Sequence, residues 1–160
     1  MTYDLQTITS TNLALKQRLL NECLRIQNSQ IQTAKSAMDE AQESANEHQG
    51  AMEDKFESFR EACQIQRDMF AKQLDEAITT LSILKRINAT KENKNIMLGS
   101  VIITNTQKFF ISVSLGEITL DGEKYFAISA MSPLFKAMVN KNVGEDFSFR
   151  NNNYRIEAIF

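Results

Sequence analysis

Residues 43 to 57 read ESANEHQGAMEDKFE, a short polar stretch between two long segments with helical periodicity. The stretch contains Gly50, which is the only glycine before Gly99. Glycine permits the backbone conformations that end helices and form tight turns. The stretch therefore predicts the turn of a helical hairpin, in which the first helix ends near residues 46 to 48 and the second begins near Ala51.

On both sides of this turn, apolar and small residues recur every seven positions. The two series before it are Leu13, Leu20, Gln27, Ala34, Ala41 and Gln17, Leu24, Ile31, Met38, Ala45, and the series after it is Phe56, Cys63, Phe70, Ala77, Leu84. This heptad pattern is typical of helices that pack side by side, and a short connection makes them antiparallel. Capping side chains at residues 10–12 predict the start of the first helix. The predicted register places Cys23 opposite Leu74.

Charge is distributed unevenly along the predicted hairpin. Between Asp39 and Glu61 there are eight carboxylates and two basic side chains, whereas the rest of residues 1–95 carries ten basic and six acidic side chains. The hairpin is therefore predicted to have an acidic tip and a basic root, the latter near residues 85–94.

From residue 96 onward the periodicity is that of short strands. Segments rich in β-branched and aromatic residues occur at 97–103, 109–113, 125–128, 147–149 and 154–159, with turn residues between them. Ser132 followed by Pro133 is typical of a helix start. We therefore expect an α+β protein with an antiparallel coiled-coil hairpin at residues 1–90, a linker at 91–95, and a small β-sheet domain with one helix at 96–160.

Composition argues against several classes of protein. The chain has 160 residues and a net charge of −2, which is not typical of a general nucleic-acid-binding protein. No apolar run approaches the roughly 20 residues that span a bilayer, and no signal peptide is evident, so we expect a cytoplasmic protein without a membrane partner. Cys23 and Cys63 fit a reducing compartment. The sequence contains no phosphate-binding glycine loop and no cysteine spacing typical of metal sites, which argues against a self-contained nucleotide enzyme.

One C-terminal run carries a resemblance to a known family. Residues Ile128 to Asp146, ISAMSPLFKAMVNKNVGED, resemble the C-terminal signature of the GreA/GreB transcription elongation factors, roughly I-S-x-x-S-P-[IL]-x-x-A-L-[LM]-G-K-x-V-G-D. Residues 98–101, LGSV, resemble the family's strand entry F-G-S-x-V. Asn140 stands where the family usually has glycine, and Glu145 precedes the aspartate.

The resemblance implies an FKBP-like C-terminal domain that docks on bacterial RNA polymerase, with Ser132, Pro133, Lys136 and Lys141 as candidate contacts. Met138 is a further candidate contact, unless it belongs to the core. It also implies that the coiled coil enters the secondary channel of the polymerase. There, tip carboxylates would help to hold a second Mg²⁺ beside the 3′ end of a backtracked RNA, with only indirect contact to RNA and DNA. The polymerase would cut the RNA, so this chain would be no enzyme and would bind no Mg²⁺ alone.

The family tip carries an Asp-x-x-Glu pair, and this spacing occurs here as Asp54 and Glu57. The i,i+3 spacing places both carboxylates on one face of a helix. Carboxylate oxygens are suitable ligands for Mg²⁺ in two-metal phosphodiester hydrolysis. Glu53 and Glu47 would lie beside the pair. A rival pair with the same spacing is Glu40 and Glu43.

Two other functions remain open at this point. A non-cleaving regulator or inhibitor of RNA polymerase could share the architecture and place its tip charges differently. A peptidyl-prolyl isomerase or chaperone is suggested by the FKBP-like fold alone, and a fold by itself does not define a function.

Overall fold

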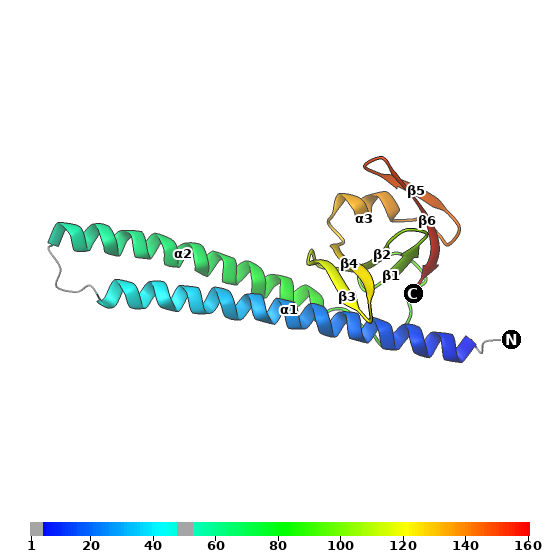
Figure 1. Cartoon of the computed structure of the whole chain (residues 1–160), viewed down its shortest axis with the longest axis horizontal. Helices are drawn as coiled ribbons and strands as arrows, with labels where there is room; N and C mark the ends of the chain where they lie inside the picture. The colour runs from blue at the N-terminus through cyan, green and yellow to red at the C-terminus, as the bar shows by residue number, and fades with distance from the viewer. Residues whose placement is uncertain (1–4, 48–52) are drawn as a thin grey trace. The chain divides into compact units, whose positions relative to one another are not determined.

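In the computed structural model the chain is an α+β protein (Figure 1). The structure describes residues 5–47 and 53–160, except the side chains of residue 47 and of residues 53–56. The elements are α1 (Leu5–Glu47), α2 (Glu53–Leu84), β1 (Val101–Thr104), β2 (Lys108–Ser112), β3 (Gly116–Leu120), β4 (Glu123–Ser129), α3 (Pro133–Met138), β5 (Asp146–Phe149) and β6 (Asn152–Ile159). The predicted class, a long helical hairpin followed by a sheet domain with one helix, is confirmed.

The chain divides into two compact units. Residues 26–82 form the hairpin unit, and residues 1–25 together with 83–160 form the sheet unit. The first part of α1 therefore groups with the sheet. The predicted domain division at residues 91–95 stays a prediction.

In the hairpin unit α1 and α2 run side by side in opposite directions (Figure 1). Gln27, Ala34 and Ala41 are buried, which confirms the first heptad series in this unit. The side-chain amide of Gln27 donates a hydrogen bond to the carbonyl oxygen of Ala77 at 2.8 Å, so these two residues lie at the same level. The predicted register would have placed Gln27 near Phe70 and is wrong by one heptad.

The ends of the long helices agree in part with the prediction. α1 is described as far as Glu47 and α2 from Glu53, so the expected end near residues 46 to 48 lies at the limit of the described residues and the expected start at Ala51 lies outside them. α1 begins at Leu5, earlier than predicted. The hydroxyl of Thr11, expected among the capping groups, instead donates to the carbonyl oxygen of Thr7 at 2.9 Å inside the helix. Within the described residues, no helix is both long and apolar enough to cross a membrane.

Four side chains from residues 16–23 of α1 are buried: Lys16, Leu19, Leu20 and Cys23. The ammonium group of Lys16 donates to the carbonyl oxygen of Lys91 at 3.1 Å. The sulfur of Cys23 lies 4.0 Å from the hydroxyl oxygen of Ser112 on β2. Both cysteines are free thiols. This part of α1 is thus held against β2 and against the segment that follows α2.

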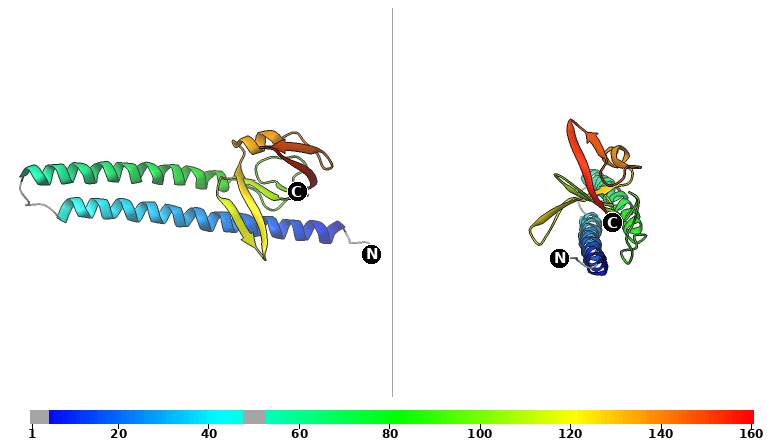
Figure 2. Two further views of the ribbon diagram at one scale, coloured as in Figure 1. Left: turned by 45° about the horizontal axis from the view of Figure 1, so that its top comes forward. Right: turned by 90° about the vertical axis from the view of Figure 1, so that its right-hand side faces the viewer.

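A surface ion pair adds a contact between α1 and the turn that joins β3 to β4. Arg18 donates two hydrogen bonds to the carboxylate of Asp121, at 2.5 and 3.0 Å. Asp121 and Gly122 both have positive φ, which is typical of the two-residue turns that join antiparallel strands. Figure 2 shows the β3–β4 hairpin beside this part of α1.

The sheet has six strands in the order β3-β4-β2-β1-β6-β5. β2 and β4 pair in parallel, and the other neighbours pair antiparallel. Its core contains Ile102, Phe109, Ile111, Met138, Phe147, Tyr154 and Ile156. The five predicted strands are present, whereas β3 was missed because Ile118 is its only buried residue. An edge strand with one inward apolar side chain gives little periodic signal.

The strand entry at Gly99 and Ser100 has a structural role. Gly99 has a φ of +93°, and a Cβ atom there would lie 3.1 Å from Cγ2 of Ile87. The buried hydroxyl of Ser100 donates to the carbonyl oxygen of Asn95 at 2.8 Å and accepts from the backbone N–H of Met97 at 3.0 Å. These contacts fold the chain back at the start of β1.

Burial lowers the pKa of the Lys16 ammonium group to about 8, and the nearby carboxylate of Glu92 partly offsets this effect. A lysine in the unfolded chain has a pKa of about 10.4, so between the folded and the unfolded pKa values the unfolded state binds more protons than the folded state. The contribution of Lys16 to the free energy of unfolding therefore increases as pH rises through that window. Burial raises the pKa of the Cys23 thiol to about 11. Above the ordinary thiol pKa the folded state therefore binds more protons, and the contribution of Cys23 to the free energy of unfolding decreases as pH rises.

We expect Lys16→Met to increase the free energy of unfolding at about pH 7.5, with a smaller gain at about pH 10, because the variant removes a buried charge. Urea unfolding at both pH values measures the difference between variant and wild type. The effect of Cys23 cancels because both proteins contain it. A difference that does not change with pH would contradict a buried, titrating Lys16.

Candidate functional site

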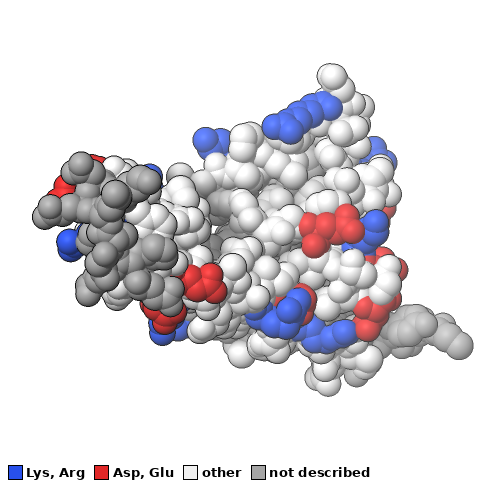
Figure 3. All heavy atoms as spheres, turned by 60° about the vertical axis from the view of Figure 1, so that its left-hand side comes forward, with Lys and Arg blue, Asp and Glu red and all other residues white. Residues whose placement is uncertain are grey.

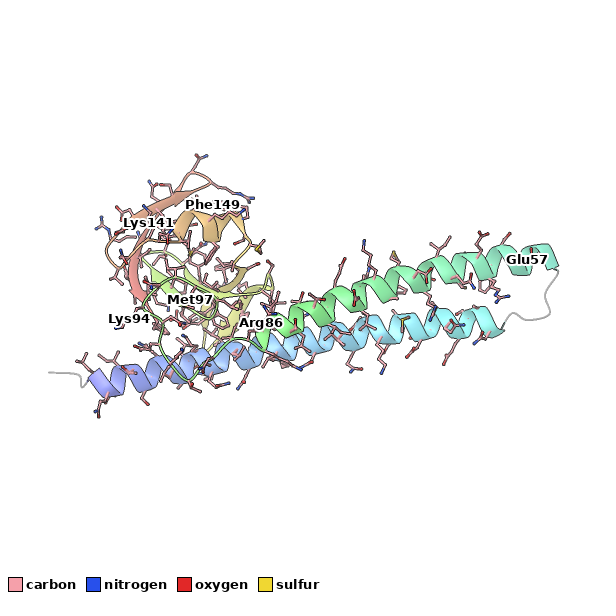
Figure 4. All side chains as sticks on the ribbon, turned by 180° about the vertical axis from the view of Figure 1, so that it is seen from behind. Glu57, Arg86, Lys94, Met97, Lys141 and Phe149 are labelled. Atoms are coloured by element: carbon pink, nitrogen blue, oxygen red, sulfur yellow. The ribbon has the colours of Figure 1, made fainter. Side chains whose placement is uncertain are left out.

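The hairpin ends with exposed carboxylates on both helices. Glu57 is exposed four residues after the start of α2, and Figure 4 places it near that end of the helix. Asp54 and Glu57 are three residues apart in continuous helix, so the backbone places them on one helix face. The side chains of Asp54, Glu53 and Glu47 lie outside the described residues. Figure 3 shows acidic atoms bordering this end of the hairpin.

The rival pair, Glu40 and Glu43, is also exposed, and both residues lie on α1 before its end at Glu47. Glu43 is four residues from that end, and Glu40 is about 10 Å from it at 1.5 Å per residue. Glu57 and Glu43 are therefore equally far in sequence from the ends of their helices. The position along the helices does not separate the two pairs, although it makes Glu40 the most remote of the four.

The charges at this end have few partners. None of Glu40, Glu43 and Glu57 forms an ion pair or a side-chain hydrogen bond within the described residues. No group of three or more His, Cys, Asp or Glu side chains in the described part of the chain is arranged to hold a metal ion. Mg²⁺ takes six oxygen ligands and usually keeps several waters, so one or two carboxylates can supply only part of a site.

In the sheet unit, the motif from Ile128 to Asp146 forms α3 and the turns beside it. Ser132 is the N-cap of α3, and its hydroxyl oxygen accepts a hydrogen bond from the backbone N–H of Phe135 at 3.2 Å. Pro133 occupies the first turn, where a missing N–H has no cost. The predicted helix start is therefore confirmed. Ser132 is half-buried, and its hydroxyl stabilises the helix.

Other motif residues also support the backbone. The hydroxyl of Ser129 accepts from the backbone N–H of Met131 at 3.0 Å. Asn140 has a φ of +67° and Gly144 a φ of +89°, conformations in which glycine and asparagine are the favoured residues. Asparagine at position 140 therefore suits the left-handed conformation found there, at the position where the family usually has glycine.

The motif residues that were expected to contact the polymerase differ in their exposure to solvent. Lys136 and Pro133 are exposed and Lys141 is half-buried, so these candidate contacts are accessible to different extents. Figure 4 shows Lys141 on the sheet unit. Met138 is fully buried in the core and cannot be a contact residue.

Two exposed apolar side chains of the motif were not predicted from the sequence. Met131 is 81% exposed and Val143 is 57% exposed. Large apolar side chains with this exposure are suited to a protein interface. Both flank residues that the motif fixes in turns, which is the signal that could have identified them.

No family model and no curated protein sequence matches the chain. Two solved structures are similar to it. The crystal structure of GreA factor homolog 1 (Gfh1) of Thermus thermophilus has 22% sequence identity, covers 89% of this chain and 93% of that chain, and gives a TM-score of 0.32. A structure of the transcription factor Gfh1 has 21% identity, covers 89% and 91%, and gives the same TM-score. At that TM-score the likeness carries no argument about function.

We expect Ser132→Ala to lower the free energy of unfolding by about 1 kcal/mol, because the substitution removes the N-cap hydrogen bond of α3. The adjacent Met131→Ser is the matched control and should change stability by less than about 0.5 kcal/mol, since Met131 packs little. Urea unfolding of both variants measures the difference. Equal losses would contradict the capping role.

Proposed function

We propose that the chain is a transcription factor of the GreA/GreB type that acts on bacterial RNA polymerase. Residues of the Ile128–Asp146 motif dock on the polymerase, and the acidic end of the hairpin enters the secondary channel. There it stimulates the cleavage of backtracked RNA by the polymerase. The proposal implies a cytoplasmic protein with no catalytic activity of its own.

The observation that carries this proposal is the set of unpaired carboxylates at the end of a two-helix hairpin. Like charges at i,i+3 or i,i+4 spacing destabilise a helix by about 0.2 to 0.5 kcal/mol per pair. Glu40, Glu43 and Glu57 have no compensating ion pair within the described residues. An acidic end that costs stability is consistent with a role outside the chain itself.

Asp54 and Glu57 are the residues that we propose as ligands for a Mg²⁺ shared with the polymerase. Glu53 and Glu47 would add negative charge nearby. Because two carboxylates fill only part of an octahedral Mg²⁺ shell, the polymerase must supply the other protein ligands. A Mg²⁺ bound there would polarise a phosphoryl oxygen and lower the pKa of a bound water.

The tip is tested with Asp54→Asn combined with Glu57→Gln, which keeps size and hydrogen bonding and removes two charges. Cleavage of backtracked RNA by stalled polymerase complexes should fall about 100-fold or more, a loss of about 2.7 kcal/mol in transition-state stabilisation. Raised Mg²⁺ should restore part of the activity by mass action. Binding to polymerase should persist.

The matched control is Glu40→Gln combined with Glu43→Gln, which removes the same charge. Equal losses from both double variants would mean that only the acidity of the tip matters. A larger loss from the control would move the metal ligands to α1. A wild-type chain that binds polymerase and stimulates no cleavage would favour the non-cleaving regulator.

Docking is tested with the full chain carrying Met131→Asp or Lys136→Glu. Both side chains are exposed, so the fold should be retained while polymerase binding weakens about tenfold, as for central contacts of an interface. The control is Lys124→Glu on β4, which reverses a charge elsewhere in the sheet unit. Co-sedimentation with purified polymerase measures the affinities. Unchanged binding in both motif variants would contradict docking through this motif.

A further inference from the structure

Two adjoining hollows lie on the sheet unit, apart from the candidate docking residues. One has a volume of about 360 Å³ and is lined by Asn105, Asp146, Asn153, Tyr154, Arg155 and Glu157. The other has a volume of about 170 Å³ and is lined by Thr106, Gln107, Asn152, Asn153 and Tyr154. They share Asn153 and Tyr154 and therefore form one bipartite site. It is formed mainly by β6 and by the loop between β1 and β2.

The side-chain amides of the loop are oriented by hydrogen bonds to β6. The carbonyl oxygen of the Asn105 side chain accepts from the backbone N–H of Arg155 at 2.9 Å. The hydroxyl of Tyr154 donates to the side-chain oxygen of Gln107 at 3.2 Å. Each amide oxygen is therefore engaged within the protein. The NH₂ groups of Asn105 and Gln107 have no partner within the described residues.

Asn153 on β6 repeats this arrangement. Its side-chain oxygen accepts from the hydroxyl of Ser148 at 2.6 Å, which leaves its NH₂ group without a partner in the described part of the chain. The site thus contains three amide side chains whose oxygens are occupied and whose N–H donors are free. Such an array selects ligands that present hydrogen-bond acceptors.

The loop that carries two of these amides is fixed in place. The buried hydroxyl of Thr104 donates to the carbonyl oxygen of Gln107 at 2.6 Å and accepts from the backbone N–H of Gln107 at 3.0 Å. The backbone N–H of Asn105 also donates to the carbonyl oxygen of Arg155 at 3.1 Å. A preorganised donor array loses little entropy on binding a ligand.

The larger hollow also carries charge. The guanidinium of Arg155 is paired with the carboxylate of Asp146 at 2.9 Å, whereas Glu157 is exposed and has no partner within the described residues. Asn153, Arg155 and Glu157 alternate along β6 and therefore lie on the same face. The free charge of the site is negative, which disfavours a phosphate or carboxylate ligand and favours a cation.

We propose that these hollows bind an extended peptide segment of a partner protein that contains a lysine or arginine. Its backbone carbonyl oxygens accept hydrogen bonds from the NH₂ groups of Asn105, Gln107 and Asn153. Its basic side chain pairs with Glu157. Asp146 is the one lining residue that belongs to the Ile128–Asp146 motif, and neither Met131 nor Lys136 lines the hollows, so the function of this surface does not depend on the proposed role at the polymerase.

The probe is acetyl-Gly-Gly-Lys-Gly-Gly-amide, added to the full ¹⁵N-labelled chain and followed by nuclear magnetic resonance. We expect saturable shifts of the three side-chain NH₂ signals, with half-saturation at about 1 to 10 mM for so short a peptide. The same peptide with glutamate in place of lysine should bind about tenfold more weakly. Glu157→Gln should reduce this preference for lysine.

Gln107→Glu distinguishes the donor array from simple charge attraction. The carboxylate still accepts the hydrogen bond from Tyr154, so the fold is retained, but the free NH₂ donor is replaced by an acceptor. Our proposal predicts binding weakened about tenfold, because the new oxygen faces a carbonyl oxygen. Nonspecific attraction of the lysine predicts stronger binding, since the site gains negative charge. Asn153→Asp should behave in the same way.

Glu117→Gln, on the opposite edge strand β3, is the matched control and should leave affinity unchanged. The proposal is overturned if no saturable shifts occur up to about 50 mM peptide, well above the expected range. It is also overturned if Gln107→Glu strengthens binding. Equal shifts produced by a single-stranded oligothymidylate would assign the site to nucleic acid and would likewise overturn it.

Discussion

Packing of the buried side chains at residues 16–23 of α1 against β2 and the segment after α2 is the constraint on which the sheet unit depends. Removing the Lys16 ammonium group from water is costly unless it gains a partner, and within the described residues its hydrogen bond is to the backbone oxygen of Lys91 at 3.1 Å. The cost is tolerated because Leu19, Leu20 and Cys23 are buried on the same helix. The segment after α2 packs in turn through Ile87, Ala89 and Ile96, which are buried as well. Gly99 then lets the chain approach Ile87 closely before it enters β1.

Heptad periodicity predicted the two long helices and the buried face of α1, but it could not fix their register. A shift of seven residues leaves every heptad position in place, so the pattern fits Gln27 opposite Phe70 as well as opposite Ala77. The hydrogen bond from Gln27 to Ala77 selects the second alternative. Gln17 belongs to a predicted series yet is exposed, whereas Lys16 is buried beside it. Contacts with distant parts of the chain determine that Lys16 is buried and Gln17 is exposed, and heptad periodicity contains no information about such contacts.

The residues of the candidate sites were predictable where their role is local in sequence and not where it depends on contacts between distant segments. The C-terminal motif identified Ser132 and Pro133 because capping and proline chemistry are local properties. It did not separate structural from exposed residues, so Met138 was grouped with contacts although it is core, and Met131 was overlooked. The donor array of Asn105, Gln107 and Asn153 was invisible in the sequence. Its orientation depends on pairing β6 with the loop after β1, some 50 residues away.

The distribution of ion pairs separates structural charges from available ones. In the sheet unit, Asp121, Glu123, Glu117 and Asp146 all pair with a basic side chain. The Arg18 and Arg155 guanidinium groups hydrogen-bond to Asp121 and Asp146 and lower the pKa of each carboxyl below its ordinary value. Glu40, Glu43 and Glu57 on the hairpin have no such partner within the described residues. Unpaired exposed charges add nothing to folding, and neighbouring like charges reduce helix stability. The acidity of this end is therefore not explained by contacts within the described residues, which agrees with the partner proposed for it, whereas the four paired carboxylates of the sheet unit are explained by the fold.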